Sequence, residues 1–277
     1  MEGERSLNLH LSGIAAHSMG DSPALEPLVR HVAGVIRSAP AFDRPFRHLE
    51  FAQVFPADVY AAMLRAMPEA ADYRPMSGRT ARTTSRAQPT RIKVDLLPEY
   101  IRHFAPAKRD IWSLVGRALC SRELQAAFVE RLAPNLEARF GVRYADVGLF
   151  PIPILTRDIP GYSIAPHTDT HWKAITVQLY LPRDDSTAHI GTIFHERTAD
   201  GTCKKVSQVR FAPNRGYAFA VGEDTWHSAD PVGPEVETRD SILLTYFVDS
   251  GAWRYFRNRG KRLGNLIRNE LRYLNRT

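Results

Sequence analysis

The sequence predicts an α+β fold in which helices precede a β-rich half. Between residues 23 and 146 most apolar side chains recur at the three- and four-residue spacing of amphipathic helices. From residue 147 they fall into short runs separated by turns with proline and glycine, which is typical of an antiparallel sandwich or barrel. With 277 residues and a 44% hydrophobic composition, the chain is long enough to bury one large core.

The helical half is expected to form a layer over one face of a sheet. Residues 1–22 show no sustained period and are predicted to be a flexible N-terminal arm, so that residues 23–277 form a single domain. Helices are expected from Pro23 to Ile36, between Pro56 and Pro68, and at 97–104, 108–118 and 121–139, with a short strand at 46–51. Residues 23–146 would then support a β-rich core at 147–250.

A basic segment at 74–91 interrupts the helical half. Small and polar residues separate its five arginines, Arg74, Arg79, Arg82, Arg86 and Arg91. A solvated mobile loop is one interpretation. The other is a lid or anion-binding wall over an active site, because guanidinium groups bind carboxylates and phosphates with two parallel hydrogen bonds. In that case Arg79, Arg82 and Arg86 are candidate substrate-binding residues.

The β-rich half contains at least seven short apolar runs. They lie at 147–155, 162–164, 174–181, 191–195, 206–211, 216–221 and 241–248. The chain has no dinucleotide-binding, phosphate-loop or nucleophile-elbow motif and no internal repeat. His195, at the end of one run, is expected at the surface.

The net charge of +7 is concentrated at the C-terminus. From Arg254 to Thr277 there are eight basic residues and one acidic residue, which accounts for the whole excess. A nucleic-acid partner is therefore not expected. Residues 251–277 are predicted to form a basic C-terminal helix, whose apolar side chains between 263 and 274 pack against the outer face of the sheet. A homodimer contact or the docking of an acidic carrier protein are alternative roles.

Three residues have the chemistry of a metal site. His167 and Asp169 are separated by one residue, so on a strand their side chains point to the same face. His227 follows a tight turn far downstream, where an antiparallel barrel could bring it to the same end. Two histidines and one carboxylate form the facial triad of non-haem iron(II) oxygenases, which leaves coordination positions open. His171 is an alternative ligand.

A second element supports the same interpretation. On a strand, Arg239 and Ser241 share one face with Leu243 and Thr245, while Ile242 points to the other face. A buried arginine requires a partner. A dicarboxylate cosubstrate is a natural one, because its distal carboxylate can bind the guanidinium group and the serine hydroxyl.

These motifs resemble those of a known superfamily. The order H-x-D, H, R-x-S is similar to that of the 2-oxoglutarate/iron(II)-dependent oxygenases. The segments from Gly161 to Asp169 (GYSIAPHTD) and from Lys173 to Pro182 (KAITVQLYLP) resemble more closely the bacterial prolyl-hydroxylase-like group. The likeness extends over about residues 45–250.

The resemblance implies a double-stranded β-helix, or jelly-roll, barrel flanked by helices mainly from the N-terminal half. It implies Fe(II) bound by His167, Asp169 and His227, 2-oxoglutarate bound by Arg239 and Ser241, and O2 as second cosubstrate. The expected reaction is hydroxylation of an unactivated C–H bond in a small or carrier-linked metabolite, with formation of succinate and CO2. The related halogenases have a small residue at the position of Asp169, so a hydroxylase is favoured over a halogenase.

Further candidates lie near these motifs. Tyr162 and Thr176 are candidate contacts of 2-oxoglutarate, and Gln178 and Thr245 are candidate substrate contacts. Thr176, Gln178 and Tyr180 share a strand face that is expected to line the cavity. The substrate is expected to be a small molecule with an anionic group, because of the basic segment at 74–91.

Two other functional classes are compatible with the triad. A jelly-roll hydrolase or isomerase could hold zinc or manganese on the same ligands, although it would not need Arg239 and Ser241. A non-catalytic metal-binding module is the other.

No apolar run approaches the roughly 20 residues of a membrane span, so no membrane partner is expected. Two cysteines, Cys120 and Cys203, form no disulfide framework, and a cytoplasmic location is expected.

Overall fold

The computed structural model describes residues 23–76, 83 and 88–274, and its strands form two antiparallel sheets. The larger sheet has eight strands in the order β1-β2-β10-β7-β12-β5-β4-β3. These strands are β1 (Ala41–Phe42), β2 (His48–Phe51), β3 (Arg74–Pro75), β4 (Arg91–Asp95), β5 (Leu149–Asp158), β7 (Lys173–Tyr180), β10 (Gly216–Ala220) and β12 (Arg239–Val248). The smaller sheet has the order β6-β11-β8-β9, with β6 (Ile164–His167), β8 (Thr192–Arg197), β9 (Cys203–Gln208) and β11 (His227–Ala229).

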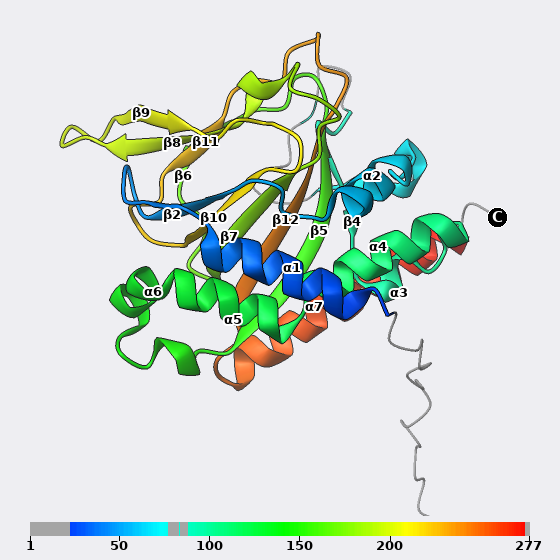
Figure 1. Ribbon diagram of the computed structural model, residues 1–277, viewed down its shortest axis with the longest axis horizontal. Helices are drawn as coiled ribbons and strands as arrows, with labels where there is room; N and C mark the ends of the chain where they lie inside the picture. The colour runs from blue at the N-terminus through cyan, green and yellow to red at the C-terminus, as the bar shows by residue number, and fades with distance from the viewer. Residues whose placement is uncertain (1–22, 77–82, 84–87, 275–277) are drawn as a thin grey trace, which may run out of the picture.

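The helices gather on one side of the larger sheet, and the smaller sheet lies on the other (Figure 1). They are α1 (Leu25–Ser38), α2 (Ala57–Arg65), α3 (Pro98–Ile101), α4 (Pro106–Leu119), α5 (Arg122–Arg131), α6 (Ala133–Phe140) and α7 (Ala252–Leu274). The local sequence explains where several of these helices begin. Proline stands in the first turn of α3, α4 and α6, and the hydroxyl of Ser121 accepts the Leu124 amide at the start of α5.

Two hydrophobic clusters fill the spaces between these layers. The larger lies between the helices and the eight-stranded sheet and includes Trp112, Phe128 and Leu244. The smaller lies between the two sheets and is rich in aromatic rings, among them Phe194 and Phe219. The space between the sheets is thus the place where polar side chains from both can meet.

The alternation predicted for the last strand is confirmed. Strand β12 pairs with β5 on one side and β7 on the other, with Ser241 opposite Thr156 and Tyr180. Ile242, Leu244, Tyr246 and Val248 belong to the core under the helices. Arg239 and Leu243, on the opposite face, line a pocket between the sheets. Strand β7 follows the same rule, since Thr176 and Gln178 line that pocket and Val177 and Leu179 belong to the helical core.

Several expectations require correction. The strands form two separate sheets in the described part of the chain, and not one closed barrel. The basic segment at 74–91 is not a loop throughout, because its ends are the paired strands β3 and β4. The candidates Arg79, Arg82 and Arg86 and the arm at 1–22 lie outside the described residues. His195 is buried and not at the surface, and its Nε2 lies 2.7 Å from the Ser228 hydroxyl.

The C-terminal helix also differs from the prediction. It starts at Ala252, and its buried residues are the polar Asn258 and Asn269. Most of its large apolar side chains are exposed, whereas Leu266 and Tyr273 are half-buried. Among the described residues, none of the helices has the length and apolarity that crossing a bilayer requires.

Candidate active site

Three predicted ligands converge at the edge of the smaller sheet. His167 ends β6 and His227 begins β11, and the two residues are direct cross-strand partners. Their rings lie 4.3 Å apart between centroids. Asp169 follows two residues after β6, and one ligand atom of each residue lies within 4.8 Å of the others. The strand pairing therefore explains how residues distant in sequence form one potential metal site.

Backbone carbonyls orient both histidines. Nδ1 of His167 lies 3.0 Å from the Ala165 carbonyl, and Nδ1 of His227 lies 2.9 Å from the Thr225 carbonyl. Because a carbonyl oxygen only accepts, each Nδ1 must carry the proton. Each Nε2 then carries the lone pair that a metal ligand needs.

Asp169 is held as a carboxylate by two donors from β7. The ammonium group of Lys173 donates to Oδ1 and the hydroxyl of Thr176 donates to Oδ2, both at 2.6 Å. Burial by itself would raise the pKa of Asp169, but Lys173, His227 and these hydrogen bonds together hold it well below its usual value. Burial lowers the pKa of His227 to about 4 against the attraction of Asp169.

The donor set therefore fits a divalent metal. At neutral pH it offers one carboxylate and a neutral His227, which are the protonation states that bind a metal. Two imidazoles and one carboxylate suit iron(II) with open positions. The same ligands could also hold zinc or manganese, so the neighbouring side chains have to distinguish the chemistry.

The triad opens into a pocket between the sheets. Its wall includes Tyr162, Thr176 and Gln178, which the sequence had indicated, together with Arg91 and Arg239. Thr176 and Gln178 of β7 and the predicted arginine of β12 thus reach the same pocket as the triad. Tyr180, expected on the same cavity face, belongs instead to the hydrophobic cluster between the sheets. Thr176 contacts Asp169 directly, and whether it also contacts 2-oxoglutarate stays a prediction.

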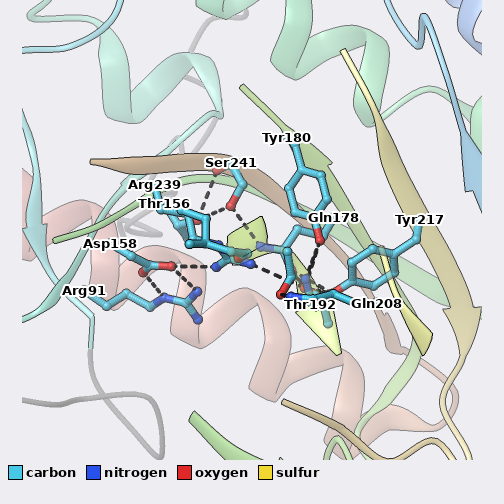
Figure 2. A network of polar contacts seen from close by, with 12 residues as sticks. Arg91, Thr156, Asp158, Gln178, Tyr180, Thr192, Gln208, Tyr217, Arg239 and Ser241 are labelled. Atoms are coloured by element: carbon cyan, nitrogen blue, oxygen red, sulfur yellow. Dashed lines mark hydrogen bonds and ion pairs between the residues drawn. The ribbon is translucent and has the colours of Figure 1, made fainter. Parts of the chain in front are cut away.

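Arg239 lies at the inner end of the pocket and is 1% exposed. It donates from Nη1 to Asp158 at 2.9 Å, from Nε to the Ile190 carbonyl at 2.9 Å, and from Nη2 to the Thr192 hydroxyl at 3.4 Å. Figure 2 shows the guanidinium group between Asp158 and the residues around Thr192. A protein carboxylate thus binds the group that we expected to bind a cosubstrate carboxylate.

A second arginine shares the same carboxylate. Arg91 donates to Oδ1 and Oδ2 of Asp158 at 2.5 and 2.8 Å (Figure 2). Its guanidinium group also lies 4.1 Å from the ring centroid of Tyr162. In the described part of the chain, two buried positive charges therefore face one negative charge, which leaves one positive charge at the inner end of the pocket. A bound anion would balance it.

Ser241 lies in a buried hydrogen-bond network beside this cluster. Its hydroxyl lies 2.9 Å from the Thr156 hydroxyl and accepts from the Gln178 amide at 2.9 Å. The Gln178 carbonyl oxygen accepts in turn from the Tyr217 hydroxyl at 2.7 Å (Figure 2). The network fixes Gln178 and Ser241 next to Arg239, and binding of 2-oxoglutarate by Ser241 stays a prediction.

The remaining candidates are less closely connected to the pocket. Thr245 is buried in β12 opposite Thr176 and Ile152, and its contact with a substrate stays a prediction. The side chain of His171 is exposed and is not part of the three-residue ligand group.

Four supporting residues were not among the candidate site residues, although Arg91 belongs to the basic segment that was considered as an anion-binding wall. Lys173 was visible as a basic residue four positions after Asp169, but only the fold shows that the two side chains meet. Asp158 and Arg91 come from strands that precede the triad. Arg139 on α6 donates to the carbonyls of His171, Lys173 and Val221 at 2.6, 2.6 and 2.7 Å.

Comparisons with known proteins give only distant likenesses. No family model matches the chain, and no curated protein resembles its sequence significantly. A Pseudomonas putida prolyl-4-hydroxylase superposes with a TM-score of 0.47 at 18% identity, over 78% of this chain and 98% of that chain. A 2OG-Fe(II) oxygenase family oxidoreductase from Burkholderia pseudomallei gives 0.45 at 14%, over 82% and 93%.

A third solved structure is the non-heme alpha-ketoglutarate-dependent epimerase SnoN from nogalamycin biosynthesis. It gives a TM-score of 0.44 at 14% identity, over 80% of this chain and 83% of that chain. All three scores lie below 0.5, so the chemistry of this site has to be inferred from its own side chains.

Proposed function

We propose that the protein is an iron(II)- and 2-oxoglutarate-dependent oxygenase. The observation that supports this best is that one pocket joins a two-histidine, one-carboxylate group to a buried cluster with an excess positive charge. A hydrolase or isomerase could use the first feature, but it has no need of the second. A non-catalytic metal-binding module would use the oriented histidines, but it would not need the cationic inner end.

Nε2 of His167, the Asp169 carboxylate and Nε2 of His227 would hold the iron. When bound there, iron(II) would supply the activation of dioxygen that couples the conversion of 2-oxoglutarate to succinate and CO2 with oxidation of the substrate. Lys173 and Thr176 keep the carboxylate ionised and oriented. The carbonyls of Ala165 and Thr225 keep both imidazoles in the ligating tautomer.

The inner end of the pocket would bind the distal carboxylate of 2-oxoglutarate. Arg239 is the candidate donor there, with Ser241 beside it. The single excess charge shared with Arg91 and Asp158 matches the single charge of that carboxylate. Tyr162 and Thr176, which both line the pocket, are further candidate contacts.

We infer hydroxylation of an unactivated C–H bond as the reaction. Asp169 supports this, because a carboxylate fills the coordination position that a halide would need. The inferred substrate is a small or carrier-linked metabolite with an anionic group. Gln178 and Thr245 are candidate contacts, and simultaneous Arg79→Ala, Arg82→Ala and Arg86→Ala substitutions test the basic segment. Unchanged turnover of an identified substrate in that variant would remove the basis for the anionic group.

We also infer that the two facing antiparallel sheets have the jelly-roll topology expected for such an enzyme.

The decisive experiment for the function is anaerobic addition of Fe(II) and then 2-oxoglutarate to the protein. A weak visible metal-to-ligand charge-transfer band is expected with the native chain and not with Asp169→Ala. Absence of the band from the native protein would refute the oxygenase.

A further inference from the structure

Helix α7 is amphipathic but lies with its polar side against the protein. Asn258 donates to the Asp249 carboxylate at 2.8 Å, and Asn269 donates to the Tyr100 carbonyl at 3.0 Å. Arg272 donates to the carbonyls of Asp72 and Tyr73 at 2.8 and 2.7 Å. These contacts are spread over the length of the helix and set its rotation, so the opposite side is held towards solvent.

That opposite side is a continuous apolar stripe. Its members are 51–70% exposed and follow the three- and four-residue steps of one helix face, namely Trp253, Phe256, Leu263, Ile267, Leu271 and Leu274. Together with Tyr255 they make up seven of the ten exposed large hydrophobic residues in the described part of the chain. Contiguous apolar surface of this kind marks a site of interaction. At 1.5 Å per residue the helix is about 35 Å long.

One flank of the stripe is strongly basic. Arg254, Arg257, Lys261 and Arg268 follow each other along the helix beside the apolar side chains. Within the described chain none of the four has a salt bridge, whereas Arg259 pairs with Asp249 and Arg262 pairs with Glu99. Arg254 and Arg257 are half-buried and lie 5.9 and 4.2 Å from the ring centroid of Trp172, whereas Lys261 and Arg268 are exposed. The positive charge beside the stripe is thus not neutralised by a carboxylate of the described chain.

We propose that α7 binds an anionic lipid surface, with the stripe in the interface and the basic flank at the headgroups. A helix with aromatic and aliphatic residues on one face and lysine and arginine beside it has the composition of interfacial membrane helices. Charge complementarity favours this partner over a second copy of the chain, because the helix of each copy would bring the same positive excess. The proposal does not depend on the oxygenase function, and it departs from the sequence-based expectation that no membrane is involved.

Gly260 allows lipid to be distinguished from a closely packed protein helix. It lies on the exposed side between Phe256 and Leu263, and a Cβ added there would meet nothing within 4 Å. Gly260→Leu would add apolar area to the stripe and should strengthen lipid binding. If a partner helix packs against the bare backbone, the same change should weaken binding.

The test is flotation of the full chain with vesicles of phosphatidylcholine alone or of equal parts phosphatidylcholine and phosphatidylglycerol. Binding is expected to the mixed vesicles only and to weaken with salt. Lys261→Gln with Arg268→Gln should lower the partition coefficient about 25-fold, since each cation near such a surface contributes roughly fivefold. Leu263→Glu with Ile267→Glu should abolish binding. Val142→Glu is the matched control, because Val142 is 81% exposed and lies outside α7.

Three results would overturn the proposal. The first is no flotation with the mixed vesicles by a chain whose circular dichroism and melting are native. The second is a dimer in light scattering that Leu263→Glu with Ile267→Glu dissociates and that salt strengthens, which would identify a second copy as the occupant. The third is weaker binding by Gly260→Leu, which would identify a protein helix.

Discussion

Arg239 and Asp158 form an ion pair with 2.9 Å between Nη1 and Oδ2, and their side chains are only 1% and 0% exposed. The pair occupies the place where we infer a cosubstrate carboxylate to bind. Arg91 allows Arg239 to pair with Asp158 and still attract a cosubstrate carboxylate, because Arg91 supplies a second positive charge to the same aspartate. The inner end of the pocket thus retains the capacity for one more anion.

Asp158→Asn tests whether Asp158 neutralises one of the two buried guanidinium charges. Removing the carboxylate leaves two buried guanidinium groups without a counter-charge, which should lower the free energy of unfolding by about 3–5 kcal/mol. Added succinate should restore more stability to this variant than it adds to the native protein. Urea unfolding with and without succinate measures both effects. Equal gains in the two proteins would contradict the charge count.

Two controls accompany that variant. Arg91→Gln combined with Asp158→Asn removes one charge of each sign, so its stability should exceed that of Asp158→Asn alone. Asp43→Asn removes the carboxylate of an exposed pair with Arg47. It should cost no more than about 1 kcal/mol.

Thr176→Val should weaken metal binding while leaving the shape of β7 intact. The substitution removes the hydroxyl that donates to Asp169 at 2.6 Å. Loss of such a supporting hydrogen bond typically lowers metal affinity about 10- to 100-fold. Calorimetric titration with Mn²⁺ measures the effect, and Thr176→Ser, which retains the hydroxyl, should bind almost like the native protein. The prediction fails if the valine and serine variants have equal affinities.

Arg139→Gln tests whether α6 positions the metal ligands. The native guanidinium group ties the segment after Asp169 to Val221, which precedes the turn before His227. Without it, both stability and Mn²⁺ affinity should fall. Arg131→Gln is the matched control, because Arg131 donates to the Ala39 carbonyl at 2.6 Å away from the triad. It should lose stability with unchanged Mn²⁺ affinity, and a similar loss of affinity in both variants would contradict a positioning role.

Thermal unfolding separates the three functional classes. Fe(II) or Mn²⁺ followed by 2-oxoglutarate, each at about 100 times its dissociation constant, should each add about 2.7 kcal/mol to the native protein. Asp169→Ala should lose both effects, and Arg239→Gln should retain the metal effect but lose that of 2-oxoglutarate. Stabilisation by zinc with no response to 2-oxoglutarate would favour a hydrolase, and no response to either would favour a non-catalytic module in which the triad is only structural.

Much of the site was predictable because strand geometry is local. The two-residue period of a strand places Arg239 and Leu243 of β12 on one face. Asp169 does meet His167, but it lies outside β6, which ends at His167, so the strand period is not the reason. The pairing of His167 with His227 needed the further step that β6 and β11 are neighbours. The support from Asp158, Arg91 and Arg139 could not be predicted, since it depends on which strands and helices lie side by side.

The orientation of α7 could not be predicted either. Its period indicates an amphipathic helix, and the usual rule buries the apolar side. Here the hydrogen bonds of Asn258, Asn269 and Arg272 with the protein decide the rotation. Periodicity separates an apolar face from a polar face, but it does not predict which of the two packs against the rest of the protein.

The place of β12 in the sheet has a consequence for biosynthesis. Among the described strands it comes last in the sequence, yet it lies between β7 and β5 within the eight-stranded sheet. A nascent chain therefore cannot complete the sheet until β12 has left the ribosome. Because β12 also carries Arg239, a prematurely terminated product would lack the middle of the sheet together with the cationic end of the pocket. Chains that end before β12 would thus be recognisable to proteases as unfolded.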